Sequence, residues 1–368
     1  MSNNITSQPS AYRIYKIDLA LPQTKLISHI QEILNETQSH KATVMNENFW
    51  NWQYVNTPGK HSCVYVAEMN DQIVGYYHVP IYEGKIAGQD GLIAMIQDVA
   101  IHPAARGKGL FTKLATYANQ DIDTQKIEAC YTFPNHKSIH TFLKYNDYTI
   151  IDVLKSYILW IDTRILLRKK LKIPLINDAL GYILNLFLKI PQKQKTESIQ
   201  EIENFDTSVE RLYQTYLQQY SNYVIRNVEY LTWRYKMRPY STYFTLGYYE
   251  ANNLTAVAIF KIDTMFKVPV LLLMDYAFTD IKHFFELIQH APTISQKYSA
   301  GEKVAFIFAA MCDKHFIGQK KPFFFLPVPK WMNPRKLHLL TRPVQNSHYD
   351  IIKDSQKWFV TLGDWDVF

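Results

Sequence analysis

The stretch that decides the fold of this chain is residues 97–111, which read QDVAIHPAARGKGLF. A β-rich, apolar run over residues 93–101 leads into His102-Pro103, and a basic turn with two glycines follows. From residue 110 onward, apolar residues recur at helical spacing (Leu110, Leu114, Ala115 and Ala118). The stretch therefore predicts a strand, a glycine turn and the start of a helix.

This strand–turn–helix pattern predicts an anion site. Gly107 and Gly109 permit close approach of a ligand to the backbone, and the first N–H groups of a helix point outward at its end. Arg106 and Lys108 add positive charge where a pyrophosphate would bind. Two common phosphate loops are excluded: GxGxxG would need a glycine where Thr112 stands, and GxxxxGK[ST] does not occur.

The same residues resemble motif A of the GNAT superfamily of acyl-CoA-dependent N-acetyltransferases, Arg/Gln-x-x-Gly-x-Gly/Ala. That pattern falls on Arg106, Gly109 and Phe111. Phe111 departs from the usual small residue, so we expect an altered helix–sheet contact with the phosphate site retained. A second block, Asn135 to Ser138 followed by residues 142–148, comes after a predicted strand as in the family. The resemblance covers residues 12–155.

The resemblance implies that acetyl-CoA is bound and that its acyl group passes directly to an amine in a ternary complex. The residues implied in holding acetyl-CoA are Val99, Ile101, Arg106, Gly107, Lys108, Gly109, Leu110, Phe111, Asn135 and Ser138. The main chain of the strand, around Val99–Ile101, would pair with the pantetheine arm.

Direct transfer also needs a base and an acid. Asp98 is the candidate base, and the alternative is a structural carboxylate. The general-acid tyrosine of the family aligns with Phe142, which has no proton to give, so Tyr145 and Tyr131 are the candidate replacements, with Tyr145 retained as the candidate acid. The chain end offers Asp366 or the terminal carboxylate, and the alternative there is a final strand.

An internal repeat predicts a duplicated fold. Trp52-Gln-Tyr54 and Pro58 recur, all at one constant offset, as Trp233-Arg-Tyr235 and Pro239. After a short deletion in a loop, IQDVA at 96–100 then aligns with LMDYA at 273–277, although chance similarity of aromatic strands is the alternative. The second copy lacks the glycine turn and is expected to bind no CoA. We predict an α+β fold of two GNAT-like units, each a mixed, mostly antiparallel sheet flanked by helices. The expected division is 1–162, a connector at 163–200, and 201–368.

The connector is strongly basic. Residues 164–195 contain eight Lys or Arg and one acid, Asp178, around an apolar stretch at 179–190. The favoured interpretation is a connector whose apolar face packs on the protein. The alternative is an interfacial helix drawn to an anionic membrane surface.

Composition narrows the classes of protein and of partner that fit this chain. The 368 residues include only 3 scattered Cys, which argues against a disulfide scaffold. The net charge of +7 favours anionic partners. No secretory signal is visible, so a cytoplasmic location is expected. No metal is expected, since His136 and His140 lack a third ligand. The expected acceptor is a small-molecule amine (an amino sugar, amino acid or polyamine), and nucleic acid is not an expected partner. The alternatives are a tRNA-dependent aminoacyl transferase of the tandem-GNAT type and a non-catalytic acyl-CoA-binding protein.

Overall fold

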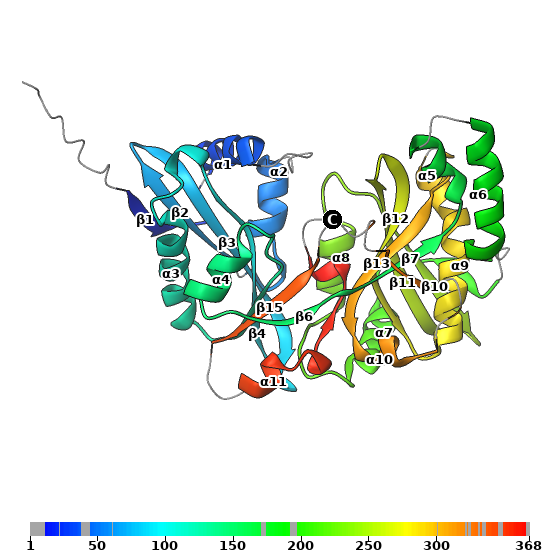
Figure 1. The fold of residues 1–368 in the computed structure, drawn as a ribbon. Helices are drawn as coiled ribbons and strands as arrows, with labels where there is room; N and C mark the ends of the chain where they lie inside the picture. The colour runs from blue at the N-terminus through cyan, green and yellow to red at the C-terminus, as the bar shows by residue number, and fades with distance from the viewer. Residues whose placement is uncertain are drawn as a thin grey trace, which may run out of the picture. The chain divides into compact units, whose positions relative to one another are not determined.

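The computed structural model describes residues 12–21, 23–37, 45–60, 62–170, 174–191, 197–299, 301–320, 322, 325–329, 332, 336–344 and 349–365. The chain divides into two compact units (Figure 1). The first contains Met1–Ile151 and Leu339–Lys353, and the second contains Asp152–His338 and Asp354–Phe368. The expected second domain, 201–368, thus contributes a short segment to the first unit.

The first unit is built on a mixed sheet in the order β1-β2-β3-β4-β5-β15-β6. Its strands are β1 (Arg13–Lys16), β2 (Ser62–Met69), β3 (Gln72–Ile86), β4 (Gln89–Ile101), β5 (Ile127–Thr132), β15 (His338–Pro343) and β6 (Thr149–Val153). The first four are antiparallel neighbours, β4 and β5 are parallel, and β15 is antiparallel to β5.

Helices cover both faces of this sheet (Figure 1). They are α1 (Thr24–Thr37), α2 (Glu47–Trp50), α3 (Leu110–Asp123), α4 (Ile139–Tyr145) and α11 (Tyr349–Lys353). The turn at Asn70–Asp71 has positive φ at both residues, which matches the twist of the flanking strands. The predicted helical face of α3 is confirmed: Leu110, Leu114 and Ala118 are buried in the core against β2 and β3.

The second unit repeats this plan with the strand order β14-β7-β13-β12-β11-β10-β8. Its strands are β7 (Lys155–Trp160), β8 (Ile199–Glu201), β9 (Tyr223–Val224), β10 (Tyr243–Glu250), β11 (Asn253–Met265), β12 (Val268–Phe278), β13 (Phe306–Asp313), β14 (Leu326–Pro327) and β16 (Phe359–Val360). Its helices are α5 (Thr163–Lys170), α6 (Pro174–Leu188), α7 (Thr207–Leu217), α8 (Val228–Tyr235), α9 (Ile281–Tyr298) and α10 (Lys314–Gly318).

The two units confirm the predicted duplication and the α+β fold. The first and last residues of β2 and of β10 are separated by the same number of residues as Trp52 and Trp233, so both ends of the strand correspond in the two copies. The parallel pair β4–β5 corresponds to β12–β13, and the hairpin turn at Asn70–Asp71 corresponds to Ala251–Asn252, again with positive φ at both residues. The two mixed sheets therefore share one arrangement of strands and turns.

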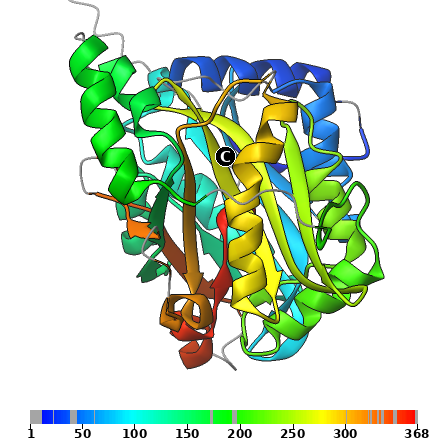
Figure 2. The same cartoon turned by 90° about the vertical axis from the view of Figure 1, so that its right-hand side faces the viewer.

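The expected connector forms a helical hairpin, α5 and α6, within the second unit. Helix α9 crosses one face of the second sheet, and the hairpin stands at its margin (Figure 2). Among the helices in the described parts of the chain, none combines the length and the apolarity that crossing a membrane requires.

Candidate functional site

The predicted strand, glycine turn and helix are present in the first unit. Strand β4 ends at Ile101, a short 3-10 turn covers Pro103–Ala105, and α3 begins at Leu110. The side chain of His102 accepts a hydrogen bond from the backbone N–H of Ala104 (3.2 Å), and Arg106 Nε donates to the carbonyl of Ile101 (3.0 Å). These bonds tie the turn to the end of the strand.

Both glycines of the turn adopt a backbone conformation that other residues avoid. Gly107 has φ +80° and Gly109 has φ +68°, and Gly109 is the N-cap of α3. A Cβ added at either position would meet no atom of the described chain within 4 Å, so the turn borders open space. The N-cap residue Gly109 has no side chain to cap α3, so the first N–H groups of the helix can face an anion.

Beyond Ile96, β4 pairs with the described chain along one edge only. Its parallel pairing with β5 ends at Ile96 and Thr132, whereas its antiparallel pairing with β3 continues to Ile101. Residues 97–100 are half-buried, in contrast to the buried stretch 93–96. The backbone of Val99–Ile101 therefore faces an edge where an extended ligand arm can add main-chain hydrogen bonds.

Asp98 lies at a bulge on this edge. The register of β3 against β4 shifts between Tyr76 and His78, and Asp98 has φ +46°. Such left-handed residues in strands are costly and concentrate at functional sites. The Asp98 side chain retains 23% of its exposure and accepts hydrogen bonds from Tyr54 Oη (2.5 Å) and Gln53 Nε2 (3.1 Å).

A buried histidine extends this network. His78 is fully buried, and its Nδ1 lies 2.5 Å from Tyr54 Oη and 3.9 Å from the Asp98 carboxylate. Burial, and then the charge of Asp98, raise the pKa of nearby Tyr76 well above its usual value, so this phenol stays neutral. Asp98 is thus an oriented carboxylate with hydrogen-bond donors on its inner side.

The second unit has the same aspartate in a different environment. Asp275 takes the place of Asp98 and accepts from Tyr235 Oη (3.0 Å), as Asp98 accepts from Tyr54. Its side chain is fully buried and forms an ion pair with Arg226 (2.9 Å). Burial raises the pKa of this carboxyl, although the Arg226 guanidinium opposes the rise.

The chain itself covers the equivalent strand edge in the second unit. Residues 274–277 of β12 are buried, and the 3-10 turn Leu362–Asp364 lies against them. Arg234 Nε donates to the Gly363 carbonyl (2.9 Å), and Arg226 pairs with Asp364 (2.6 Å). The N-terminus of α9, the counterpart of α3, is capped by the side chain of Asp280. Asp366 lies outside the described residues.

The candidate acids lie in contrasting positions in the first unit. Tyr145 is the last residue of α4 and is 49% exposed, whereas Tyr131 is buried on β5. Phe142, at the position of the family tyrosine, is buried between Phe111 and Tyr148, with ring centroids 5.8 and 5.1 Å away. Phe111 and Phe142 thus pack together in the core.

Asn135 and Ser138 follow the parallel neighbour of β4, so their turn lies at the same edge of the sheet as the glycine turn. Asn135 Oδ1 accepts from the backbone N–H groups of Lys137 (2.9 Å) and Ser138 (3.1 Å). Asn135 therefore shapes the start of α4. Helix α4 begins at Ile139, so His140 lies within it and His136 precedes it.

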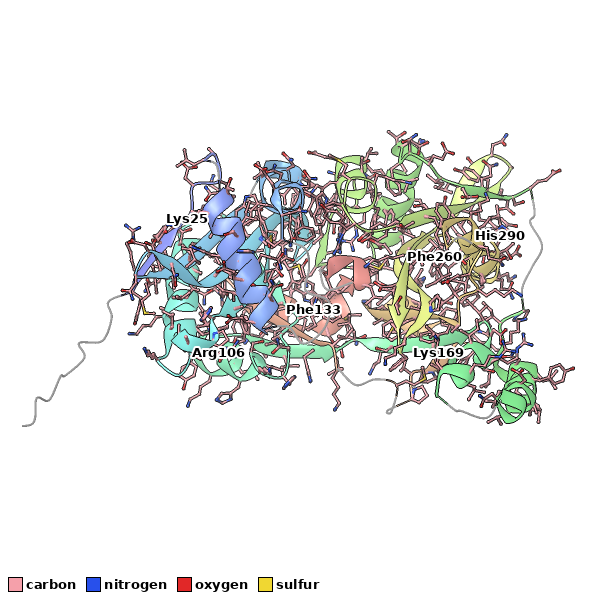
Figure 3. All side chains as sticks on the ribbon, turned by 90° about the horizontal axis from the view of Figure 1, so that it is seen from above. Lys25, Arg106, Phe133, Lys169, Phe260 and His290 are labelled. Carbon is pink, nitrogen blue, oxygen red and sulfur yellow. The ribbon has the colours of Figure 1, made fainter. Side chains whose placement is uncertain are left out.

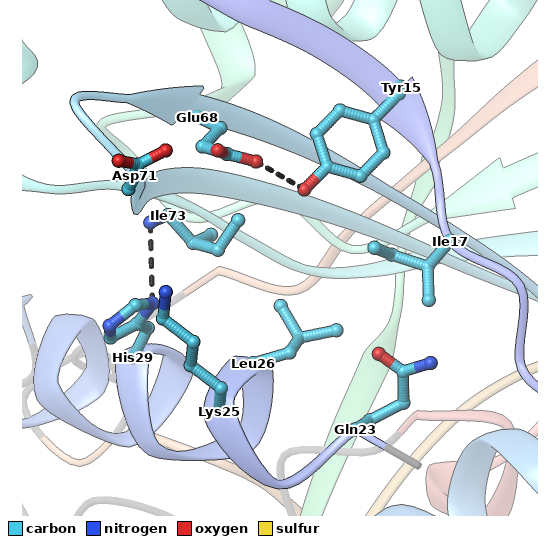
Figure 4. Close-up of a pocket in the computed structure, with 9 residues that line it drawn as sticks. All are labelled: Tyr15, Ile17, Gln23, Lys25, Leu26, His29, Glu68, Asp71 and Ile73. Carbon is cyan, nitrogen blue, oxygen red and sulfur yellow. Dashed lines mark hydrogen bonds between the residues drawn. The ribbon is translucent and has the colours of Figure 1, made fainter. Parts of the chain in front are cut away.

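A separate pocket of about 220 Å³ lies between α1 and the first strands of this unit (Figure 4). Of its two carboxylates, Glu68 and Asp71, Glu68 accepts a hydrogen bond from Tyr15 Oη (2.5 Å). This bond, together with Arg13, lowers the pKa of Glu68. On its other side, the Ile73 N–H donates to His29 (3.4 Å). No residue predicted for the acyl-CoA site lines this pocket. Over the described ranges, no group of three or more His, Cys, Asp or Glu side chains is placed to hold a metal ion.

The sequence analysis missed the hydrogen bonds that orient Asp98. Trp52-Gln-Tyr54 entered the sequence analysis only as part of the repeat, and Tyr54 is buried. The signal was available in the repeat: Tyr54 and Asp98 recur together as Tyr235 and Asp275. A tyrosine and an aspartate that recur together in a duplicated chain predict a contact between them.

Residues 23–149 match a family model described as an acetyltransferase (GNAT) domain. No curated protein sequence matches the chain. Among solved structures, a probable N-acyltransferase of unknown function from Enterococcus faecalis V583 has 13% identity and a TM-score of 0.62, and the match covers 92% of this chain and 74% of that one.

Two other similar structures are of named enzymes. N-myristoyltransferase from Saccharomyces cerevisiae with bound myristoyl-CoA has 13% identity and a TM-score of 0.60, covering 92% of this chain and 84% of its own. A GCN5-related N-acetyltransferase from Anabaena variabilis has 13% identity and a TM-score of 0.59, covering 91% and 73%. At this identity the likeness concerns the fold, and it extends over both units.

Proposed function

We propose that this chain, an acyltransferase of the GNAT superfamily, transfers an acyl group from acyl-CoA to a primary amine of a small molecule, with acetyl-CoA as the expected donor. The observation that carries the proposal is the contrast between the two copies. The first unit combines an open strand edge with an uncapped helix start and a glycine turn. In the second unit the chain covers the strand edge, the side chain of Asp280 caps the helix start, and Thr279-Asp280 stands between β12 and α9 in place of a glycine turn.

The pyrophosphate of acyl-CoA is assigned to the glycine turn. Backbone N–H groups at the start of α3 donate to phosphate oxygens, and Arg106 and Lys108 supply positive charge. The open space in front of Gly107 and Gly109 accommodates a group that a side chain would displace. The residues present therefore fit a phosphate-bearing substrate.

The thioester is assigned to the open edge of β4, where the main chain of Val99–Ile101 is available for pairing. A backbone N–H at this edge would stabilise the negative charge that develops on the thioester oxygen. The amine nitrogen forms a bond to the thioester carbon, and the carbon–sulfur bond breaks. The nitrogen loses a proton, and the departing thiolate gains one.

Asp98 is proposed as the acceptor of the amine proton, directly or through water. Its carboxylate is partly exposed at the bulge of β4, and Tyr54 and Gln53 hold it from the inner side. Tyr145 is proposed as the donor to the thiolate, since it is exposed and has a proton to give, whereas Phe142 has none. The small-molecule amine remains a class: amino sugar, amino acid or polyamine.

The first experiment is titration of the full chain with acetyl-CoA and, separately, myristoyl-CoA, because one similar structure holds the longer donor. The matched variants are Gly109→Ala and Gly88→Ala, since both glycines have positive φ and open space at Cβ. Each substitution is expected to cost about 1 kcal/mol of stability through backbone strain. Only Gly109→Ala is expected to weaken acyl-CoA binding, by at least about tenfold, since about 1.4 kcal/mol corresponds to a factor of ten.

Turnover is then measured as release of the CoA thiol in the presence of a panel of small amines. We expect release with at least one amine and its loss in Asp98→Asn. Failure of both acyl-CoA donors to bind, or unchanged affinity in Gly109→Ala, would refute the proposed site. Binding without thiol release on the whole panel would refute the small-molecule acceptor.

A further inference from the structure

Helix α6 in the second unit packs inward through polar and small residues. Its neighbour is α5, where Thr163 Oγ1 donates to the Gly181 carbonyl (3.0 Å) and to Asn185 Oδ1 (2.8 Å). Asn185 Nδ2 in turn donates to Asp162 Oδ1 (3.0 Å). A Cβ on Gly181 would collide with Arg164, so the two helices lie in close contact. Leu184 and Leu188 complete this inner side and are half-buried.

The outward side of α6 is apolar. We call the following residues the outer stripe: Leu180, Tyr182, Ile183, Leu186 and Phe187, which are 39%, 62%, 52%, 65% and 70% exposed. Their spacing of three and four residues places them on one face of the helix. A helix on a water-soluble protein normally directs this face at the core. The sequence favoured that arrangement, and the structure places the apolar face outward.

Basic residues lie on α5, the helix that packs beside α6. Arg168 on α5 pairs with Asp178 on α6 (2.7 Å), which links the basic side of α5 to the stripe-bearing helix. Beside α5 lies a pocket of about 600 Å³, whose basic lining residues are Arg164, Arg168, Lys169, Lys267 and Lys303 and whose acids are Asp162 and Glu302. Lys169, near the end of α5, lies at the surface (Figure 3). We call this the basic pocket.

We propose that the α5–α6 hairpin docks this protein on an anionic membrane surface. The outer stripe enters the boundary between headgroups and acyl chains, and the basic pocket receives phosphate headgroups. At 15 residues α6 is too short to span the hydrocarbon core, and it fits a helix lying in the interface. A second copy of this chain would match the apolar stripe but would bring the same positive charge, so charge favours the anionic lipid.

The test is flotation of the full chain with vesicles of phosphatidylcholine, with and without phosphatidylglycerol. We expect binding only to the anionic vesicles, and weaker binding as salt rises. The double variant L186S/F187S is expected to lower the partition coefficient about 100-fold, roughly tenfold for each side chain that no longer leaves water. Met237→Ser removes an apolar side chain of similar exposure (57%) elsewhere in the second unit and should leave binding unchanged.

Charge is tested separately with Lys169→Glu, which is expected to weaken vesicle binding about fivefold or more. Lys282→Glu, at an exposed position on α9, is the matched control and should have little effect. Equal binding to neutral vesicles, no binding at all, or unchanged binding of L186S/F187S would overturn the proposal. So would a dimer in solution that L186S/F187S dissociates, because the stripe would then be covered by a second copy. Acetyl-CoA affinity, measured on the same samples, reports separately on the first unit.

Discussion

Replacing Gly363 with alanine tests whether the C-terminal segment fills the strand edge of the second unit. A Cβ at this position would collide with the Tyr235 hydroxyl and would lie 3.0 Å from the Met274 carbonyl oxygen and 3.2 Å from the Asp275 carboxylate. Tyr235 is buried and donates to Asp275, so moving its hydroxyl removes a donor from a buried carboxylate. Overpacking and the lost hydrogen bond each cost about 1–3 kcal/mol, which gives roughly 3 kcal/mol for Gly363→Ala.

The assay is urea-induced unfolding of the full chain. Gly318→Ala is the control, because its Cβ would meet no atom within 4 Å, and it should change stability by less than about 0.5 kcal/mol. In a Tyr235→Phe background the colliding hydroxyl is absent, so Gly363→Ala should cost at least about 1 kcal/mol less. A Gly363→Ala protein as stable as the control variant would refute the close packing of this segment on β12.

Four further substitutions separate structural roles from catalytic ones. Asp98→Asn should lower kcat/KM on the order of 100-fold at a small cost in stability. Asp275→Asn should instead lower the free energy of unfolding by about 3 kcal/mol, measured with urea, because buried Arg226 loses a charged partner. Burial would raise the pKa of Asp162, but hydrogen bonds from Arg164 and Asn185 outweigh it and lower the pKa to about 2. Asp162 should therefore contribute about 2 kcal/mol above pH 4, lost as pH falls through 2, and acid unfolding of Asp162→Asn should lack this component. Phe142→Tyr should lower the free energy of unfolding by about 1–3 kcal/mol, measured by thermal unfolding, because the added hydroxyl would be buried. It should bring no gain in thiol release.

Local patterns explain why the sequence predicted much of the fold. The strand ending at Ile101, the glycine turn and the helix from Leu110 each depend on neighbouring residues, and all three are confirmed. The repeat at a constant offset predicted the second sheet because duplicated strands keep their alternation and their turns.

Contacts between distant segments were not predictable in this way. Strand β15 inserts beside β5, with Leu340 opposite Thr132, although most of the second unit lies between them in the sequence. No local periodicity specifies such a partner, because alternation identifies the buried face of a strand but not its neighbour. The orientation of the apolar face of α6 was not predicted for a related reason, because residue spacing defines such a face but not the side on which it lies. Only the inward hydrogen bonds of Asn185 and Thr163 show that this face points away from the core.

The duplication also distinguishes the contacts that the fold requires from the features that would bind a ligand. The tyrosine–aspartate hydrogen bond is present in both copies, as Tyr54 with Asp98 and Tyr235 with Asp275, so it belongs to the scaffold. The copies differ in what meets the strand edge and the helix start. In the second unit the carboxylate of Asp280 caps α9, where a phosphate would meet α3 in the first. The segment around Gly363 likewise lies on the edge of β12, where an extended ligand arm would meet β4. Protein groups thus occupy both of these places in the second copy, which is why we propose an acyl-CoA site for the first unit alone.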